Sequence, residues 1–231
     1  MAQGQLKYAI FAIDYYTKWV EVEPLAKITK QNVTNFIWKH IICWFQIPWV
    51  LVSNHDTQFE NERLISICRN LGITKIFSCP AHPKSNGQVE VVNKTIKYTL
   101  KKKLEKSKGF WVDELPLVLW SYRTSFCTTT GETPFSLAYG IDDVVPVELG
   151  IPIFRIENFN KEGNDILLAL ASDLLEEKHE KAQLWATTLQ QTVERHYNSK
   201  VRLRHITKSD LVLRRIFLNT KEQGVRVLGP N

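Results

Sequence analysis

Residues 8–24 read YAIFAIDYYTKWVEVEP, two short runs of strand-forming residues in succession. The run from Tyr8 to Tyr15 is apolar, aromatic and β-branched, which predicts a buried strand. The run from Trp19 to Pro24 alternates apolar and acidic residues, which predicts a second, half-exposed strand. Asp14 stands near the end of the first run. A carboxylate in such a setting must be paired or bind a metal ion.

Helical and strand-like segments alternate downstream of this stretch. Thr29 is a candidate N-cap, because apolar residues recur at helical spacing after it, and that helix should stop before Pro48. A strand is expected at 50–53, a helix at 60–71 and a further strand at 74–78. Strands that alternate with helices predict an α/β fold.

The second half of the chain is predicted to be mainly helical. Residues 80–87 (PAHPKSNG) have the composition of a loop, and helices are expected at 88–106 and 111–122. The likeliest domain boundary is 146–152, which begins and ends with proline. Residues 165–197 form a long, charge-rich helical pattern with one apolar stripe, which could pack on the core or on another copy of the chain. Residues 210–218 (DLVLRRIFL) predict a strand.

Length and composition set the class of protein. The 231 residues, 44% of them apolar, are enough for one domain with an appendage or for two small domains. No run could span a bilayer and no signal peptide is evident, so we expect a soluble, intracellular chain. The four cysteines lie far apart and are expected to be mostly buried thiols.

The net charge of +6 is spread unevenly along the chain. Residues 75–108 hold nine basic and two acidic side chains, and residues 195–231 hold the same numbers. The segment 132–194 between them holds four basic and twelve acidic side chains. Concentrated lysine and arginine is typical of a protein that binds a polyanion such as nucleic acid, although a solvated helix face and a basic tail would look alike.

Three segments carry a family resemblance: AIDYYTKWVE (12–21), VSNHDTQF (52–59) and HPKSNGQVEVVNKTIK (82–97). Together they resemble the catalytic core of retroviral-type integrases, most closely those of gypsy-type LTR retrotransposons. The later segments WSYRTS, TPFSLAYG, DLVLRR and LGPN are also similar to that family, so the resemblance covers nearly the whole chain in order.

The resemblance implies a specific architecture. The fold class is α/β, with an RNase H-like mixed sheet flanked by helices, followed by a long helical linker and an incomplete C-terminal β-module. The expected boundaries are 1–150 for the catalytic core, 151–200 for the linker and 201–231 for a truncated module that resembles a small β-barrel. On this reading the chain is a truncated integrase.

The resemblance also implies a catalytic site. In the family, three carboxylates hold two divalent cations that drive an in-line attack on a phosphodiester, and hard cations require oxygen ligands. Asp14 matches the first family carboxylate and Glu90 the third, so both are candidate ligands of Mg²⁺ or Mn²⁺. The second catalytic position falls on Asn54.

Asn54 is the departure from the family pattern with the largest consequence. Asparagine keeps a carbonyl oxygen but lacks the negative charge, so two dications would meet two carboxylates instead of three. We therefore expect weakened metal binding and severely impaired catalysis. Asp56 lies two residues further along the chain, so its side chain would start several ångströms away, and rescue by it is not expected.

A DNA-binding face is expected on the helix that carries Glu90. Lys94, Lys97 and Lys101 follow Glu90 at i+4, i+7 and i+11, which puts them on its face of the helix. The resemblance implies that Lys94 and Lys97 contact the element's DNA end and that Asn86 belongs to a flexible loop beside the site. The outer lysines, at 102, 103, 106 and 108, could extend this patch or belong to a solvated face.

A zinc site is a rival interpretation. The pairs His40-x-x-Cys43 and Cys79-x-x-His82 supply two histidines and two cysteines. Packing inside a helix is the more common fate of such residues, and the resembled family has no zinc site in this region. The tryptophans are interpreted as core or interface residues and not as platforms for base stacking.

Three functional hypotheses stay open on the sequence alone. The first is an active polynucleotidyl transferase. The second, which the sequence favours, is a nucleic-acid-binding protein of retrotransposon origin that has lost catalysis at Asn54. The third is a self-associating or decaying remnant with no activity. The resemblance further implies DNA and other copies of the chain as partners, a nuclear location, and neither a membrane nor a small-molecule substrate.

Overall fold

The computed structural model describes residues 6–78, 87–107, 110–141, 160–202, 207–208 and 210–211. The chain divides into two units, residues 1–192 and residues 193–231. The predicted domain boundary at 146–152, all but the first two residues of the strand predicted at 210–218, and most of the C-terminal module lie outside the described residues. No helix among the described residues is long and apolar enough to cross a membrane.

The first two strands form an antiparallel hairpin. β1 (Tyr8–Ile13) pairs with β2 (Val20–Leu25), with Tyr8 opposite Leu25 and Ile13 opposite Val20. The turn closes with Lys18 in the left-handed region (φ 63°) and with a hydrogen bond of 2.8 Å from the backbone N of Asp14 to the carbonyl of Trp19. The two strands predicted from the opening stretch are confirmed.

One continuous helical segment follows the hairpin. It comprises α1 (Lys30–Phe36), the π-helical turn η2 (Ile37–Ile42) and α2 (Cys43–Phe45). Thr29 is the N-cap, as predicted: its side chain accepts a hydrogen bond from the backbone N of Asn32. The segment ends before Pro48, also as predicted.

The second pair of strands is parallel and is connected by a helix. β3 (Val50–Ser53) pairs with β4 (Thr74–Phe77), and α3 (Glu62–Asn70) connects them. Asn61 is the N-cap of α3, because its side chain accepts from the backbone N of Leu64. These elements confirm the predicted strand, helix and strand.

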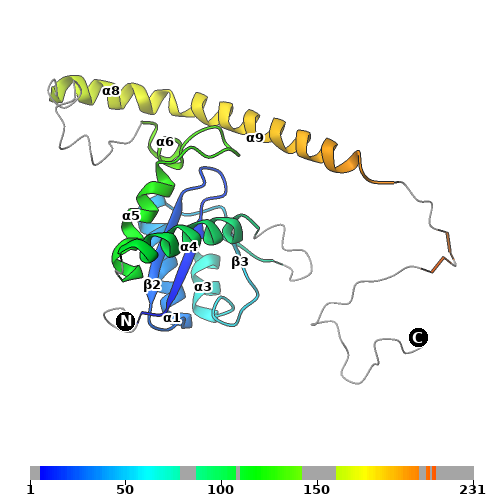
Figure 1. The fold of residues 1–231 in the computed structure, drawn as a ribbon. Helices are drawn as coiled ribbons and strands as arrows, with labels where there is room; N and C mark the ends of the chain where they lie inside the picture. The colour runs from blue at the N-terminus through cyan, green and yellow to red at the C-terminus, as the bar shows by residue number, and fades with distance from the viewer. Residues whose placement is uncertain are drawn as a thin grey trace. The chain divides into compact units, whose positions relative to one another are not determined.

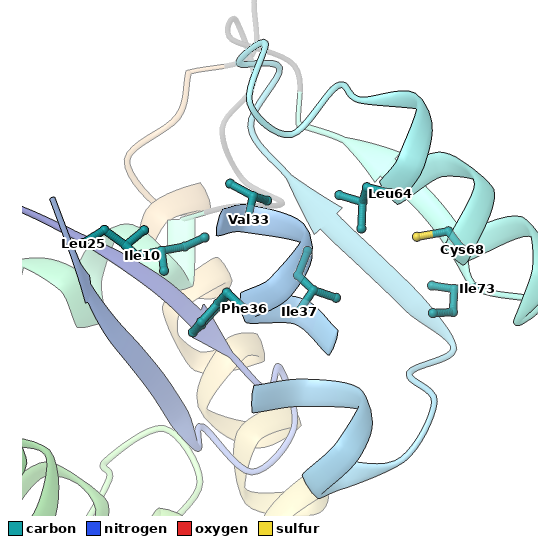
Figure 2. Packing of buried hydrophobic residues seen from close by; sticks show 8 residues of the cluster. All are labelled: Ile10, Leu25, Val33, Phe36, Ile37, Leu64, Cys68 and Ile73. Carbon is teal, nitrogen blue, oxygen red and sulfur yellow. The ribbon is translucent and has the colours of Figure 1, made fainter. Parts of the chain in front are cut away.

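Two apolar clusters form the core. The first cluster combines residues of the hairpin, the helical segment and α3 with the residue before β4: Ile10, Leu25, Val33, Phe36, Ile37, Leu64, Cys68 and Ile73. Figure 2 shows Val33, Phe36 and Ile37 between Ile10 and Leu25 on one side and Leu64, Cys68 and Ile73 on the other. The second cluster packs the hairpin against two further helices through Val20, Val22, Val92, Ile96, Leu100, Leu115, Val118 and Leu119.

The other helices of the described residues follow in order along the chain (Figure 1). They are α4 (Gly87–Ser107), α5 (Trp111–Arg123), α6 (Pro134–Tyr139), α8 (Lys161–Asp173) and α9 (Leu175–Asn198). The predicted long helical pattern therefore exists as two consecutive helices. The short helix α6 was not predicted.

The α/β class is confirmed, with one antiparallel and one parallel pair of strands among the helices. Within the described residues the two pairs are separate two-stranded sheets, with the orders β1-β2 and β3-β4. They share the first cluster but no ladder of hydrogen bonds connects them.

The expectation that the cysteines are mostly buried is wrong in part. Cys68 is buried as expected, but Cys43 is exposed and Cys127 is half-buried. Trp44 and Trp49, interpreted as core or interface residues, are 77% and 87% exposed, which places them outside the core and leaves the interface part of the interpretation a prediction. The π-helical turn directly before Cys43 changes which side chains point inward, and this change has no signature in the apolar spacing.

Candidate nucleic-acid interface

The exposed face of α4 carries the predicted lysines. Val92, Ile96 and Leu100 are buried in the second cluster and fix the inward side of the helix. Lys94, Lys97 and Lys101 are exposed, together with Glu90. At about 100° per residue these four side chains fall within roughly 60° of one another on the side away from the core. The expected row of lysines beside Glu90 is therefore present.

The outer lysines diverge from this row. The Nζ of Lys103 lies 3.2 Å from a carboxylate oxygen of Glu114 on α5, so this ammonium is neutralised within the core domain. The Nζ of Lys102 lies 4.7 Å from the ring centre of Tyr98. Both side chains therefore contact residues of α4 or α5. The side chain of Lys106 and all of Lys108 lie outside the described residues.

Asp14 directly follows β1 and caps the hairpin turn. Its Oδ2 accepts hydrogen bonds from the backbone N and from the Oγ1 of Thr17, both at 2.7 Å. The prediction that this carboxylate must be paired or bind a metal is thus met by pairing within the turn. Its role as a metal ligand stays a prediction.

Lys18 connects this turn to the start of α4. Its Nζ donates to the Oε1 of Gln88 at 2.8 Å and also to the carbonyl of Tyr15. Burial lowers the pKa of Lys18, against the opposing effect of nearby Cys127 and Asp14. Gln88 precedes Glu90 by two residues, so Lys18 connects the turn after Asp14 to the first turn of α4. Lys18 was not among the residues predicted from the sequence.

Asn54 directly follows β3 and is held at the end of the parallel pair. Its Oδ1 accepts a hydrogen bond of 3.4 Å from the Oγ of Ser78, the residue after β4. Asp56 begins the next turn, where its backbone carbonyl accepts from the backbone N of Phe59 and of Glu60. The side chain of Asp56 is exposed.

Sequence reasoning missed Lys75, which lies near Asn54. Its Nζ donates to the Oγ of Ser53 at 3.1 Å and stands 3.9 Å from the ring centre of Phe77. Burial lowers the pKa of this lysine. The strand alternation that puts Lys75 and Phe77 on the same face of β4 was the signal available in the sequence.

Asp14 accepts hydrogen bonds from Thr17, whereas Asn54 accepts one from Ser78. In the part of the chain that the structure describes, no group of three or more His, Cys, Asp or Glu side chains could hold a metal ion. The expected weakening of metal binding by the amide at position 54 stays a prediction. Asn86 lies outside the described residues.

His40 of the rival zinc interpretation has other partners. Its Nδ1 lies 3.8 Å from Glu21 and its Nε2 lies 3.7 Å from Glu23, and its ring stacks on Phe36 with centres 5.2 Å apart. The side chain therefore bridges the helical segment and β2. Cys79 and His82 lie outside the described residues.

Known proteins with similar sequence and fold come from retroviruses, while no protein-family model matches the chain. It is 32% identical over 151 residues to the Gag-Pol polyprotein of avian reticuloendotheliosis virus, which is 64% of this chain but 13% of the polyprotein. A chain of the simian T-cell lymphotropic virus intasome, solved in complex with PP2A regulatory subunit B56 gamma, matches with a TM-score of 0.53 at 19% identity, over 60% of this chain and 52% of that one. The HTLV-2 integrase catalytic core domain, solved in complex with magnesium, matches with a TM-score of 0.47 at 18% identity, over 55% of this chain and 80% of that one.

Proposed function

We propose that this chain, a relative of retroviral Pol polyproteins with the fold of an integrase catalytic core, is a DNA-binding domain derived from an integrase that does not cleave DNA. The ancestral activity on this proposal is DNA integration. The observation that carries the proposal is the exposed row of Lys94, Lys97 and Lys101 on a helix whose opposite side is buried.

The row of lysines fits a phosphate backbone. Three ammonium groups on one exposed helix face can each neutralise a phosphate and release a condensed counterion. Because the buried side of α4 is fixed by the second cluster, the lysine face is held in one orientation relative to the core. Contacts of this kind supply affinity for DNA with little sequence preference.

Loss of cleavage is supported by the residues at the three catalytic positions. Asn54 supplies no negative charge, and its amide oxygen accepts from Ser78. Asp14 uses its Oδ2 to hold Thr17, so a metal ion bound through this oxygen would compete with two hydrogen bonds of 2.7 Å. Asp14 and Glu90 both keep an exposed carboxylate, so two of the three carboxylates of the family pattern are present.

The binding part of the proposal is tested by measuring DNA affinity as a function of salt concentration. For the unaltered chain we expect log K to fall linearly with log salt, by about 0.9 per phosphate contact. Replacing Lys94 and Lys97 by alanine should lower the magnitude of this slope by about 1.8. Lys103→Ala is the matched control, since Lys103 is paired with Glu114, and it should change the slope less than either replacement in the row. Equal slopes in all variants would refute the proposal.

The catalytic part is tested by incubating a DNA duplex with Mg²⁺ or Mn²⁺ and the purified chain, beside its Asn54→Asp variant. We expect no nicking by the unaltered chain, and nicking by it would contradict the proposal. Nicking by the variant alone would identify Asn54 as the single lesion. Absence of nicking by both proteins would support the view that Asp14 serves to fix the hairpin turn.

We further propose that the chain acts as a homo-oligomer. Ile166, Leu167 and Leu170 of α8 are 69%, 65% and 52% exposed, which is unusual for side chains of this size along one helix. Sedimentation equilibrium should show association at micromolar concentration. Replacing Leu167 and Leu170 by aspartate should yield a monomer, and a monomer before replacement would remove this part of the proposal.

A further inference from the structure

An aromatic side chain, Tyr98, stands on the exposed face of α4 beside the row of lysines. Tyr98 is 60% exposed, whereas Ile96 and Leu100 before and after it are buried in the second cluster. At about 100° per residue, Tyr98 lies within roughly 60° of both Lys94 and Lys101 around the helix. The ring therefore faces solvent on the same side of α4 as the cations to which we assign phosphate binding.

Lysines surround this ring along the helix. Lys94 is four residues before Tyr98. Lys101 and Lys102 are three and four residues after it, and at these spacings helical side chains are neighbours. The Nζ of Lys102 lies 4.7 Å from the centre of the ring. The nearest acidic residue along the helix, Glu105, is seven residues away, so the surroundings of the ring are cationic on balance.

The ring of Tyr98 contributes little to the core, because an aromatic side chain stabilises a fold through the area that it buries. The buried side of α4 is formed by Val92, Ile96 and Leu100. What an exposed ring beside ammonium groups offers is a flat apolar surface next to sites for phosphate. In a continuous duplex the faces of the bases are covered by their neighbours in the stack, so only an unpaired base can use this surface.

We propose that Tyr98 is a stacking platform for an unpaired base, so that the chain binds DNA that contains a single-stranded stretch more tightly than continuous duplex. This inference rests on the proposed DNA binding and adds the class of DNA to it. Stacking on an aromatic side chain has little sequence preference, because every base has a π face. Lys102 would neutralise a phosphate next to the stacked base, while Lys94 and Lys101 hold the backbone that leads to it.

The test compares the affinity of the chain for two DNA molecules of equal length with identical ends. One is a continuous duplex, and the other is the same duplex with a gap of a few unpaired nucleotides in one strand. We expect the gapped DNA to bind about tenfold more tightly, which is within the range for stacking of a single base. A 2-aminopurine placed among the unpaired bases should lose fluorescence on binding, because stacking quenches it.

Three variants identify the residue responsible. Tyr98→Leu removes the ring and should abolish both the preference and the quenching, while the affinity for continuous duplex stays the same. Tyr98→Phe keeps the ring and should keep both. Tyr15→Leu is the matched control, because Tyr15 is 67% exposed and the Nζ of Lys18 lies 4.7 Å from its ring centre, but it is next to Asp14 and outside the row of lysines. It should leave the preference unchanged.

Several outcomes would overturn the inference. Equal affinity of the unaltered chain for the two DNA molecules would refute it and leave the proposed DNA binding intact. A preference that survives in Tyr98→Leu would show that another residue stacks on the base. A preference lost to the same extent in Tyr15→Leu would show that the setting of Tyr98 has no special role. Binding of neither DNA would refute the proposed function, and this inference with it.

Discussion

Thr17 donates two hydrogen bonds to one carboxylate oxygen of Asp14, from its backbone N and from its hydroxyl, each 2.7 Å long. This pair fixes the turn between β1 and β2, and Lys18 then ties the turn to Gln88 at the start of α4. A residue that the family resemblance assigns to catalysis thus has a complete local role in the hairpin. The two roles make different predictions on replacement.

Replacing Asp14 by alanine should destabilise the fold. Loss of two hydrogen bonds to a charged acceptor at an exposed turn should lower the free energy of unfolding by about 1–2 kcal/mol, measured by urea denaturation. Thr17→Val, which removes only the hydroxyl donor, should have a smaller effect. A purely catalytic Asp14 would leave the midpoint of unfolding unchanged.

Arg123 holds the end of α5 against the hairpin. Its guanidinium donates to the carbonyl of Val20 at 2.7 and 3.1 Å, pairs with Glu21 at 2.8 Å and lies 4.3 Å from the Trp19 ring centre. Arg123→Ala should lower the free energy of unfolding by about 3 kcal/mol, because it removes the hydrogen bonds of the guanidinium to the carbonyl of Val20 and to the carboxylate of Glu21. Arg123→Lys should recover only part of this, since an ammonium cannot reproduce the planar fork. Full recovery by lysine would show that charge alone matters.

Alkaline pH should destabilise the domain through Tyr122. Burial raises the pKa of Tyr122 from 10.0 to about 12, and the charge of Cys127 adds to this. The folded state therefore holds the phenolic proton at pH values where the unfolded state has lost it, so stability falls as the pH rises from 10 to 12. Urea denaturation across this range should show the loss, and Tyr122→Phe should reduce it. An unchanged pH profile in the variant would assign the loss to other groups.

Local signals in the sequence predicted most of the elements, and long-range pairing was beyond them. Alternation in 19–24 and the N-cap at Thr29 predicted β2 and α1, because both signals act within a few residues. The pairing of β1 with β2 and of β3 with β4 depends on contacts between segments apart in the sequence, which no local pattern encodes. The helix α6 did have signals that were not used: an N-cap at Thr133, a proline at the next position and Gly140 in the left-handed region at the end.

The candidate interface shows the same division. Helical spacing alone placed Lys94, Lys97 and Lys101 on one face, and the burial of Val92 and Ile96 bears this out. The pairing of Lys103 with Glu114 involves a different helix, so spacing along α4 could not separate Lys103 from the row. The connection from Lys18 to Gln88 spans 70 residues and was equally out of reach.

Gly140 should be essential for the packing of α8 against the end of α6. Its φ is +76°, and a Cβ there would lie 2.9 Å from the backbone carbonyl oxygen of Ala171. Gly140→Ala should therefore lower the free energy of unfolding in two ways. The left-handed backbone would be strained by about 1–2 kcal/mol, and the new Cβ would clash with Ala171 unless α8 moved. Gly72→Ala is the matched control, because Gly72 has a φ of +71° but would place its Cβ in open space. The difference between the two variants in urea denaturation isolates the contact with α8, and equal losses of stability would show that this contact contributes nothing.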